Sequence, residues 1–182
     1  GVNYVLFFKK NGAEDFERII ETTWKDNFYI QGFDYESKNP DHAYVISNLE
    51  SDTDEILLVD LGTMKTIKKI YSNDTYDVSG ISRSRNRDYK VDYYSYTGEK
   101  RVVIPVSDYY KELHKKFQKQ FGDKQFSISS KTEAEDKYLI YVTSDRLYGK
   151  YFVYDKEDDS FKEVIDLMPQ LKESDMAEMR PI

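Results

Sequence analysis

Sets of short strands recur at a near-constant spacing along this chain of 182 residues, and no other feature restricts its fold as strongly. The strands that start near His42, Tyr89 and Lys137 are 47 and 48 residues apart. Two more strands follow the first and the last of these, and an Asp, at 60 and at 155, lies just past the second strand of each set. A further strand precedes each set. Units of 40–50 residues with four short strands indicate the blades of a β-propeller.

The hydrophobic pattern within the units agrees with stacked blades. The runs at 44–46, 56–59 and 151–154 are apolar without clean alternation, as expected of strands buried on both faces. The last strand of each set, at 65–72 and 160–167, is more polar and fits a half-exposed outer strand. The alternative is an antiparallel sandwich or meander in which the repetition arises by chance.

We therefore predict a mainly β fold, a partial β-propeller of about three to four four-stranded antiparallel blades with one inserted α-helix. The stretch at 3–24 fits a strand pair, because Asn11-Gly12 is a strong hairpin signal. The predicted units, in chain order, are an incomplete blade at 1–26, a blade at 27–73, a blade at 74–124 that carries the helix at 107–121, and a blade at 125–167.

The inserted helix is indicated by apolar residues at every fourth position, namely Tyr109, Leu113, Phe117 and Phe121. Ser107 or Asp108 can cap its first turn, and Gly122 can end it. Its other side carries Lys111, Lys115, Lys116 and Lys119. These lysines either form a binding patch or are a solvated helix face, and we favour the solvated face.

Composition excludes several classes of protein. The net charge of −7 provides no general attraction for nucleic acid. Zero Cys excludes disulfide scaffolds, Cys-ligated zinc and thiol catalysis. No apolar run approaches the roughly 18 residues of a membrane span. We expect neither nucleic acid nor a membrane as partner, and both a cytoplasmic and a bacterial periplasmic location remain open.

Known sequence motifs of catalytic, phosphate-binding and metal-binding sites are not found. The sequence has no G-x-S-x-G elbow and no phosphate-binding glycine loop. Its two histidines, His42 and His114, fall in different predicted elements, which argues against a two-His metal site. Spacing alone does not exclude a Ser-His-Asp triad. The acidic turn at 50–55 lacks the glycine of a calcium loop and fits a solvated hairpin. We predict no catalytic residue, no metal and no cofactor.

Three arginines are the candidate site residues. Arg83, Arg85 and Arg87 alternate along a predicted strand and its turn. Because a guanidinium binds a carboxylate with two parallel hydrogen bonds, these side chains could contact a peptide substrate. The alternative is that they pair with the many Asp and Glu of the chain.

Several segments resemble a known family. The stretch DVSGISRSR at 77–85, with the Tyr-rich strand and helix that follow, resembles the N-terminal propeller of prolyl oligopeptidase family serine peptidases, in the dipeptidyl-peptidase and acylaminoacyl-peptidase-like subgroup. Residues 142–167 look like the final blade of such propellers, and residues 168–182 like the bridge into the catalytic domain.

The resemblance implies a function without a reaction centre in this chain. It suggests a C-terminal part of a propeller that gates and orients peptide substrates for an α/β-hydrolase domain, and no catalytic residue carries over. The expected partners are peptide substrates, that hydrolase domain and, through bare blade faces and edges, a second copy of the fragment. A stand-alone protein-interaction module is the alternative, and a self-contained hydrolase is a third hypothesis that the missing motifs disfavour.

Overall fold

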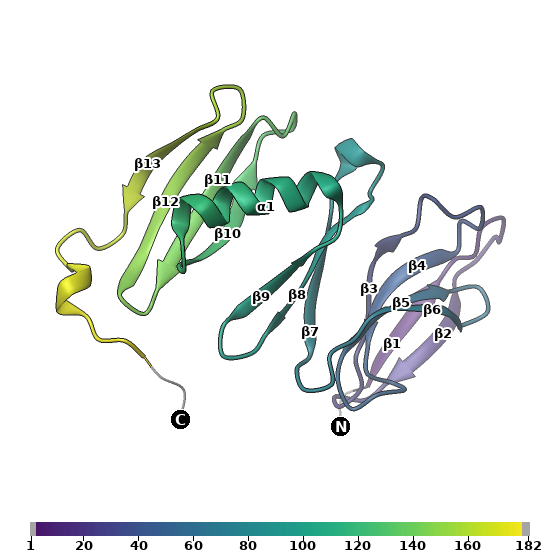
Figure 1. Cartoon of the computed structure of the whole chain (residues 1–182). Helices are drawn as coiled ribbons and strands as arrows, with labels where there is room; N and C mark the ends of the chain where they lie inside the picture. Colours follow the sequence, from purple (N-terminus) through teal and green to yellow (C-terminus); the bar gives the residue numbers. More distant parts are fainter. Residues whose placement is uncertain (1–2, 180–182) are drawn as a thin grey trace. The chain divides into compact units, whose positions relative to one another are not determined.

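The computed structural model of the protein describes residues 3–179 and is mainly β (Figure 1). Its strands are β1 (Tyr4–Phe8), β2 (Glu17–Thr22), β3 (Phe28–Phe33), β4 (His42–Ser47), β5 (Glu55–Asp60), β6 (Lys65–Tyr71), β7 (Val78–Arg83), β8 (Val91–Thr97), β9 (Arg101–Pro105), β10 (Gln125–Lys131), β11 (Lys137–Ser144), β12 (Leu147–Asp155) and β13 (Ser160–Asp166). The helices are α1 (Asp108–Phe121) and the short 3₁₀ turns η1 (Arg85–Arg87) and η2 (Glu173–Asp175). No helix among the described residues is long and apolar enough to cross a membrane.

The strands form four antiparallel sheets that follow one another along the sequence. Within each sheet the spatial order equals the chain order: β1-β2, β3-β4-β5-β6, β7-β8-β9 and β10-β11-β12-β13. Consecutive antiparallel strands joined by short connections are the topology of propeller blades, so the predicted fold class is confirmed. Two of the sheets have four strands, and the sheet β7-β8-β9 has three. The third strand of that sheet, β9, is not predicted by the strand pattern of the sequence.

The chain divides into two compact units, residues 1–110 and residues 111–182. The first contains the sheets β1-β2, β3–β6 and β7–β9, and the second contains most of α1 and the sheet β10–β13. Each unit has its own buried apolar residues, and we describe each by itself.

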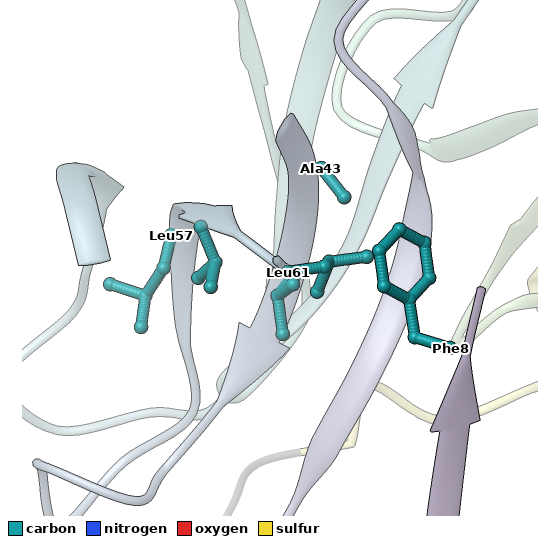
Figure 2. Packing of buried hydrophobic residues seen from close by; sticks show 6 residues of the cluster. Phe8, Ala43, Leu57 and Leu61 are labelled. Atoms are coloured by element: carbon teal, nitrogen blue, oxygen red, sulfur yellow. The ribbon is translucent and has the colours of Figure 1, made fainter. Parts of the chain in front are cut away.

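The sheet β3–β6 is buried on both faces. On one face, the ring of Phe8 from β1 joins a cluster with Leu57 and Leu61, drawn in Figure 2 together with Ala43. On the other face, Ile46 and Ile56 pack with Val78 of β7. Neighbouring residues in a strand point to opposite faces, so a strand covered on both sides has no polar face. This explains the unbroken apolar runs in the sequence.

The outer strand β6 is more polar than its neighbours, as predicted, but it lacks the alternation expected of a half-exposed outer strand. Its first five residues are exposed, and only the last two, Ile70 and Tyr71, are partly buried. The strand therefore presents mostly polar side chains to solvent rather than an alternation of buried and exposed residues.

The helix α1 has the predicted caps and a slightly different buried stripe. The backbone N–H of Tyr110 donates to Ser107 Oγ over 3.1 Å, which makes Ser107 the cap. Gly122 follows the helix with φ of 66°, a left-handed value that favours glycine. In the first unit the buried ring at the start of α1 belongs to Tyr110 rather than to the predicted Tyr109.

In the second unit, aromatic side chains join α1 to the sheet β10–β13. The ring of Phe117 is fully buried, with centroids 5.4 Å from Tyr154 and 5.8 Å from Phe161. Phe121 lies 5.1 Å from the ring of Phe152. On the opposite side of the helix the four predicted lysines are exposed, and Lys116 pairs with the exposed Asp159. Their exposure fits a solvated face and a binding patch alike, so the solvated face stays a prediction.

Residues after β13 continue through turns and η2, and the backbone N–H of Met179 donates to Asp145 Oδ2 over 3.0 Å. The last three residues of the predicted bridge at 168–182 lie outside the described part of the chain.

Candidate functional site

Arg83, the last residue of β7, has its guanidinium directed at the backbone of β3. Its Nη1 donates to the carbonyl of Phe33 over 2.7 Å and its Nη2 to the carbonyl of Gln31 over 2.8 Å. The guanidinium also lies 5.3 Å from the ring centroid of Tyr44 and 5.9 Å from that of Tyr89. Hydrogen bonds and cation–π contacts therefore both hold Arg83 between two neighbouring sheets.

A glycine in β3 makes this contact fit. The pairing of β3 with β4 shifts register between Ile30 and Gly32, and Gly32 has φ of 131°. A Cβ atom built on Gly32 would lie 1.8 Å from Arg83 Nη2. The bulge turns the carbonyls on either side of Gly32 toward the guanidinium, and any larger residue would displace it.

Arg87, in η1, forms a salt bridge with Asp92 at the start of β8. The carboxylate of Asp92 is nearly fully buried, and Arg87 Nε donates to its Oδ1 over 3.2 Å. The hydroxyl of Ser107 donates to the same carboxylate over 2.7 Å. The guanidinium of Arg87 stacks on the ring of Tyr109, 3.9 Å from its centroid. This network connects a loop, a strand and the first turn of α1.

Arg85 is exposed, in contrast to the other two arginines. The structure does not join the three side chains in one cluster: Arg83 bonds the backbone of β3 and Arg87 bonds Asp92. Contact with a peptide substrate stays a prediction for all three. Arg85 is the one whose side chain is open to solvent.

A cavity of about 430 Å³ lies between the end of β1 and the β3–β4 hairpin. It is lined by Phe8, Lys9, Asn11, Phe33, Asp34, Tyr35, Ser37, Lys38, Pro40 and Asp41. The rings of Phe8 and Phe33, 6.3 Å apart, provide an apolar wall. The backbone N–H of Asn11 donates to Asp41 Oδ1 over 3.0 Å and ties the two hairpins together. Cations and carboxylates surround an aromatic wall, an arrangement suited to an apolar side chain with its neighbouring peptide groups.

One wall of the cavity is an exposed tyrosine held by stacking. The ring of Tyr35 stacks on Tyr89 with centroids 4.6 Å apart. Tyr89 and the preceding Asp88 both have left-handed backbones, with φ of 56° and 52°. Such conformations are strained for residues with a side chain. The loop before β8 thus brings the ring of Tyr89 against Tyr35, which lines the cavity.

A serine and a histidine meet at this hairpin. Ser37 Oγ and His42 Nδ1 are 2.6 Å apart, and Ser37 Oγ also accepts from the backbone N–H of Asn39. Within residues 3–179 no carboxylate is hydrogen-bonded to the ring of His42. Ser37 and His42 are five positions apart at the two sides of one turn, and their contact closes the hairpin. The other histidine, His114, packs on Phe126 in the second unit.

Local sequence signals are weak for the residues that shape this region. Gly32 within an otherwise regular strand pattern is a recognisable sign of a bulge. Asp92 has no pattern that separates it from a surface carboxylate, and only the fold shows that it is buried beneath Arg87. The cavity depends on hairpins far apart in the sequence, so no local pattern marks it.

Comparison with known proteins finds similarity at the level of structure. No protein-family model matches the chain, and no curated protein does. One solved structure, from a structural and mechanistic analysis of two prolyl endopeptidases, superposes with a TM-score of 0.52 and 13% identity. Prolyl oligopeptidase B from Galerina marginata gives a TM-score of 0.47 and 9% identity.

The first of these similarities shows the fold alone: the described sheets resemble part of a prolyl endopeptidase structure. It covers 88% of this chain and 22% of the other, and the second covers 94% and 24%. This chain therefore spans less than a quarter of the length of the solved structures that it matches.

Proposed function

We propose that this chain is a non-catalytic propeller region of a serine peptidase, which gates and orients peptide substrates for an α/β-hydrolase domain. The observation that carries the proposal is the similarity to a prolyl endopeptidase over 88% of this chain and 22% of that one. The described sheets supply a scaffold, and no nucleophile motif occurs in the sequence. A scaffold of this kind acts by restricting which peptides reach the reacting groups.

We further propose that the cavity beside Phe8 and Phe33 contacts the substrate. It offers an aromatic wall, and its rim carries Lys9 and Lys38 as well as Asp34 and Asp41. An extended peptide presents apolar side chains alternating with hydrogen-bonding groups, and both find partners in this cavity. The exposed Arg85 can add a contact to a peptide carboxylate.

The first test is the coding sequence that surrounds this chain. We expect it to encode, after residue 182, a domain with a G-x-S-x-G elbow followed by an Asp and a His. The propeller region alone should not hydrolyse peptide nitroanilides, whereas the longer protein should. A coding sequence without a hydrolase domain would instead favour the interaction module.

The second test measures whether the cavity selects substrates. In the longer protein, Tyr35→Ala should change KM for long peptides more than KM for dipeptide nitroanilides. Trp24→Ala is the matched control, because Trp24 is exposed and does not line the cavity. Equal effects of the two substitutions on every substrate would argue against a substrate-contacting cavity.

The subgroup is a separate proposal. We propose a dipeptidyl-peptidase or acylaminoacyl-peptidase-like enzyme, supported by the resemblance over 77–85 and 142–182. A panel of substrates with a free amino terminus, an acetylated amino terminus or an internal proline distinguishes these activities. Cleavage confined to internal prolyl bonds would assign the longer protein to the endopeptidases instead.

A further inference from the structure

Asp54, the residue before β5, joins two neighbouring sheets through its backbone. Its N–H donates to Asp77 Oδ1 over 2.8 Å, and its carbonyl accepts from the N–H of Val78 over 3.1 Å. Val78 begins β7 and is almost fully buried, where it packs with Ile46 and Ile56 of the sheet β3–β6. The two hydrogen bonds therefore lie beside the apolar contact between the sheets β3–β6 and β7–β9.

The side chain of Asp54 reaches an earlier part of the chain. Its two carboxylate oxygens accept from Nδ2 of Asn27, in the connection between β2 and β3, over 3.0 and 2.9 Å. The backbone N–H of Asn27 donates in turn to Asn48 Oδ1 over 2.7 Å. One residue thus fastens three connections, β2–β3, β4–β5 and β6–β7, and all three belong to the first unit.

The carboxylate that holds this joint is buried without a cation. Asp54 is 9% exposed, and within residues 3–179 no lysine or arginine pairs with it. The charge that acts on it from the β6–β7 connection is the carboxylate of Asp77, which has the same sign. A buried charge is costly unless it is paired, and a like charge adds to the cost. An ionised Asp54 therefore works against the contacts that hold it in place.

The other charged side chains near Asp54 are held by partners of their own or are exposed. Lys69 pairs with Glu55, the residue after Asp54, over 2.6 Å. The carboxylate of Asp26 accepts from the hydroxyl of Thr23 over 2.7 Å. The remaining charged residues on the three connections are exposed to solvent, namely Lys25, Glu50, Asp52 and Asp74. Protonation is thus the change that relieves the buried charge.

We propose that Asp54 makes the joint between the sheets β3–β6 and β7–β9 responsive to pH. The joint stays closed while the carboxyl is protonated, and it opens more often when the carboxyl ionises. A protonated Asp54 keeps its carbonyl oxygen as an acceptor for the Asn27 amide and no longer repels Asp77. An ionised Asp54 gains by turning to water, which releases Asn27 and, through the backbone, weakens the bonds to Asp77 and Val78.

The direction of the pH dependence follows from the surroundings of Asp54. Burial raises the pKa of its carboxyl, the Asn27 amide lowers it, and the charge of Asp77 raises it further, so the net shift is upward. In an open joint, with Asp54 in water, the pKa returns to the usual value of about 3.9. The stabilisation of the closed joint is therefore fully present below about pH 3.9 and is lost as the pH rises through the raised pKa.

Hydrogen exchange of the Val78 amide, followed by NMR on the full chain between pH 4 and pH 7, measures this opening. After correction for the intrinsic exchange rate, we expect its protection factor to fall about threefold or more across this range. The amide of Ile140, buried in the second unit, is the reference. Asp54→Asn keeps an acceptor for Asn27 and should remove the pH dependence. Asp52→Asn, which changes an exposed carboxyl of the same connection, should leave it intact.

The carbon-13 shift of the Asp54 carboxyl provides a second readout that needs no variant. It should titrate at a higher pH in the folded chain than in the chain unfolded in urea. Four results would each overturn the proposal: a Val78 protection factor that does not change between pH 4 and pH 7, a pH dependence that persists in Asp54→Asn, an equal loss of that dependence in Asp52→Asn, or an Asp54 carboxyl that titrates no higher when folded than when unfolded.

Discussion

Asp60 and Asp155, 95 residues apart in the sequence (60 to 155), hold the same turn in two different sheets. Each is the last residue of the third strand of a four-stranded sheet. Asp60 Oδ1 accepts from the backbone N–H of Gly62 over 2.8 Å, and Asp155 Oδ1 accepts from that of Glu157 over 3.1 Å. The repeated unit is therefore reproduced at the level of single hydrogen bonds.

The backbone of the two turns follows the same path. Four residues after each Asp, Met64 and Asp159 adopt left-handed conformations, with φ of 56° and 49°. Neither is a glycine, so the carboxylate bond at the start of the turn helps to hold a conformation that the side chain disfavours.

Removing either carboxylate should weaken the turn. We expect Asp60→Ala and Asp155→Ala each to lower the free energy of unfolding by about 1 kcal/mol, the usual contribution of such a hydrogen bond. Urea denaturation followed by circular dichroism measures this change. Asp52→Ala is the control, because Asp52 is exposed and the change should be neutral. A loss for Asp60→Ala no larger than for the control would contradict a role in the turn.

The glycine beneath Arg83 should tolerate no side chain while the arginine is present. Gly32→Ala adds a Cβ in the space of Arg83 Nη2, so the guanidinium must leave two carbonyls. We expect a loss of about 2–4 kcal/mol in the free energy of unfolding, from backbone strain together with two charged hydrogen bonds.

A double-mutant cycle separates the two causes. In an Arg83→Met background, Gly32→Ala should cost only the backbone strain, about 1–2 kcal/mol. Gly12→Ala is a matched control, because Gly12 also has a positive φ but no atom lies within 4 Å of its added Cβ. If the losses in free energy of unfolding caused by Gly32→Ala and Arg83→Met were additive, the contacts of Arg83 with β3 would not require a glycine at position 32.

The buried carboxylate of Asp92 makes Arg87 a structural residue. Arg87→Met leaves the carboxylate of Asp92 buried without its cation. We expect the free energy of unfolding to fall by about 3 kcal/mol. Asp92→Asn should cost less, because the amide carries no charge and still bonds Ser107. Thermal denaturation of these variants should be compared with that of Arg85→Ala. Arg85 is exposed, so its removal should leave the stability of the fold nearly unchanged. Equal stabilities of the Arg87 and Arg85 variants would refute the assignment.

The sequence predicts the strands of this protein well because their signals are local. Short apolar runs such as Tyr44–Ile46, turn residues such as Asn11-Gly12, and the helical spacing from Leu113 to Phe121 each depend on neighbours within one element. The structure confirms the hairpin and the helix with its Ser107 cap. The strand β9 is harder to predict because its sequence, RVVIP, is short and leads straight into the helix.

The candidate site is less predictable because it depends on contacts between sheets. The alternation of Arg83, Arg85 and Arg87 suggests one group of three equivalent side chains. The turn η1 intervenes after Arg83, so the alternation of a strand does not continue through Arg87. Which arginines are covered is decided by Gly32 and Asp92, which lie at other places in the sequence.

The last prediction concerns the pH dependence of the second unit. Partial burial lowers the pKa of His114 below its usual value, because the charged ring is poorly solvated beside Phe126. The unfolded chain therefore binds a proton at a higher pH than the folded one, and stability is fully present above about pH 6.5 and lost as the pH falls through the folded pKa. His114→Phe keeps the ring contact and removes the titration. Thermal denaturation at pH 7.5 and pH 5.5 should show a smaller drop in midpoint for this variant than for the unaltered chain. An identical drop would show that other groups account for the pH dependence.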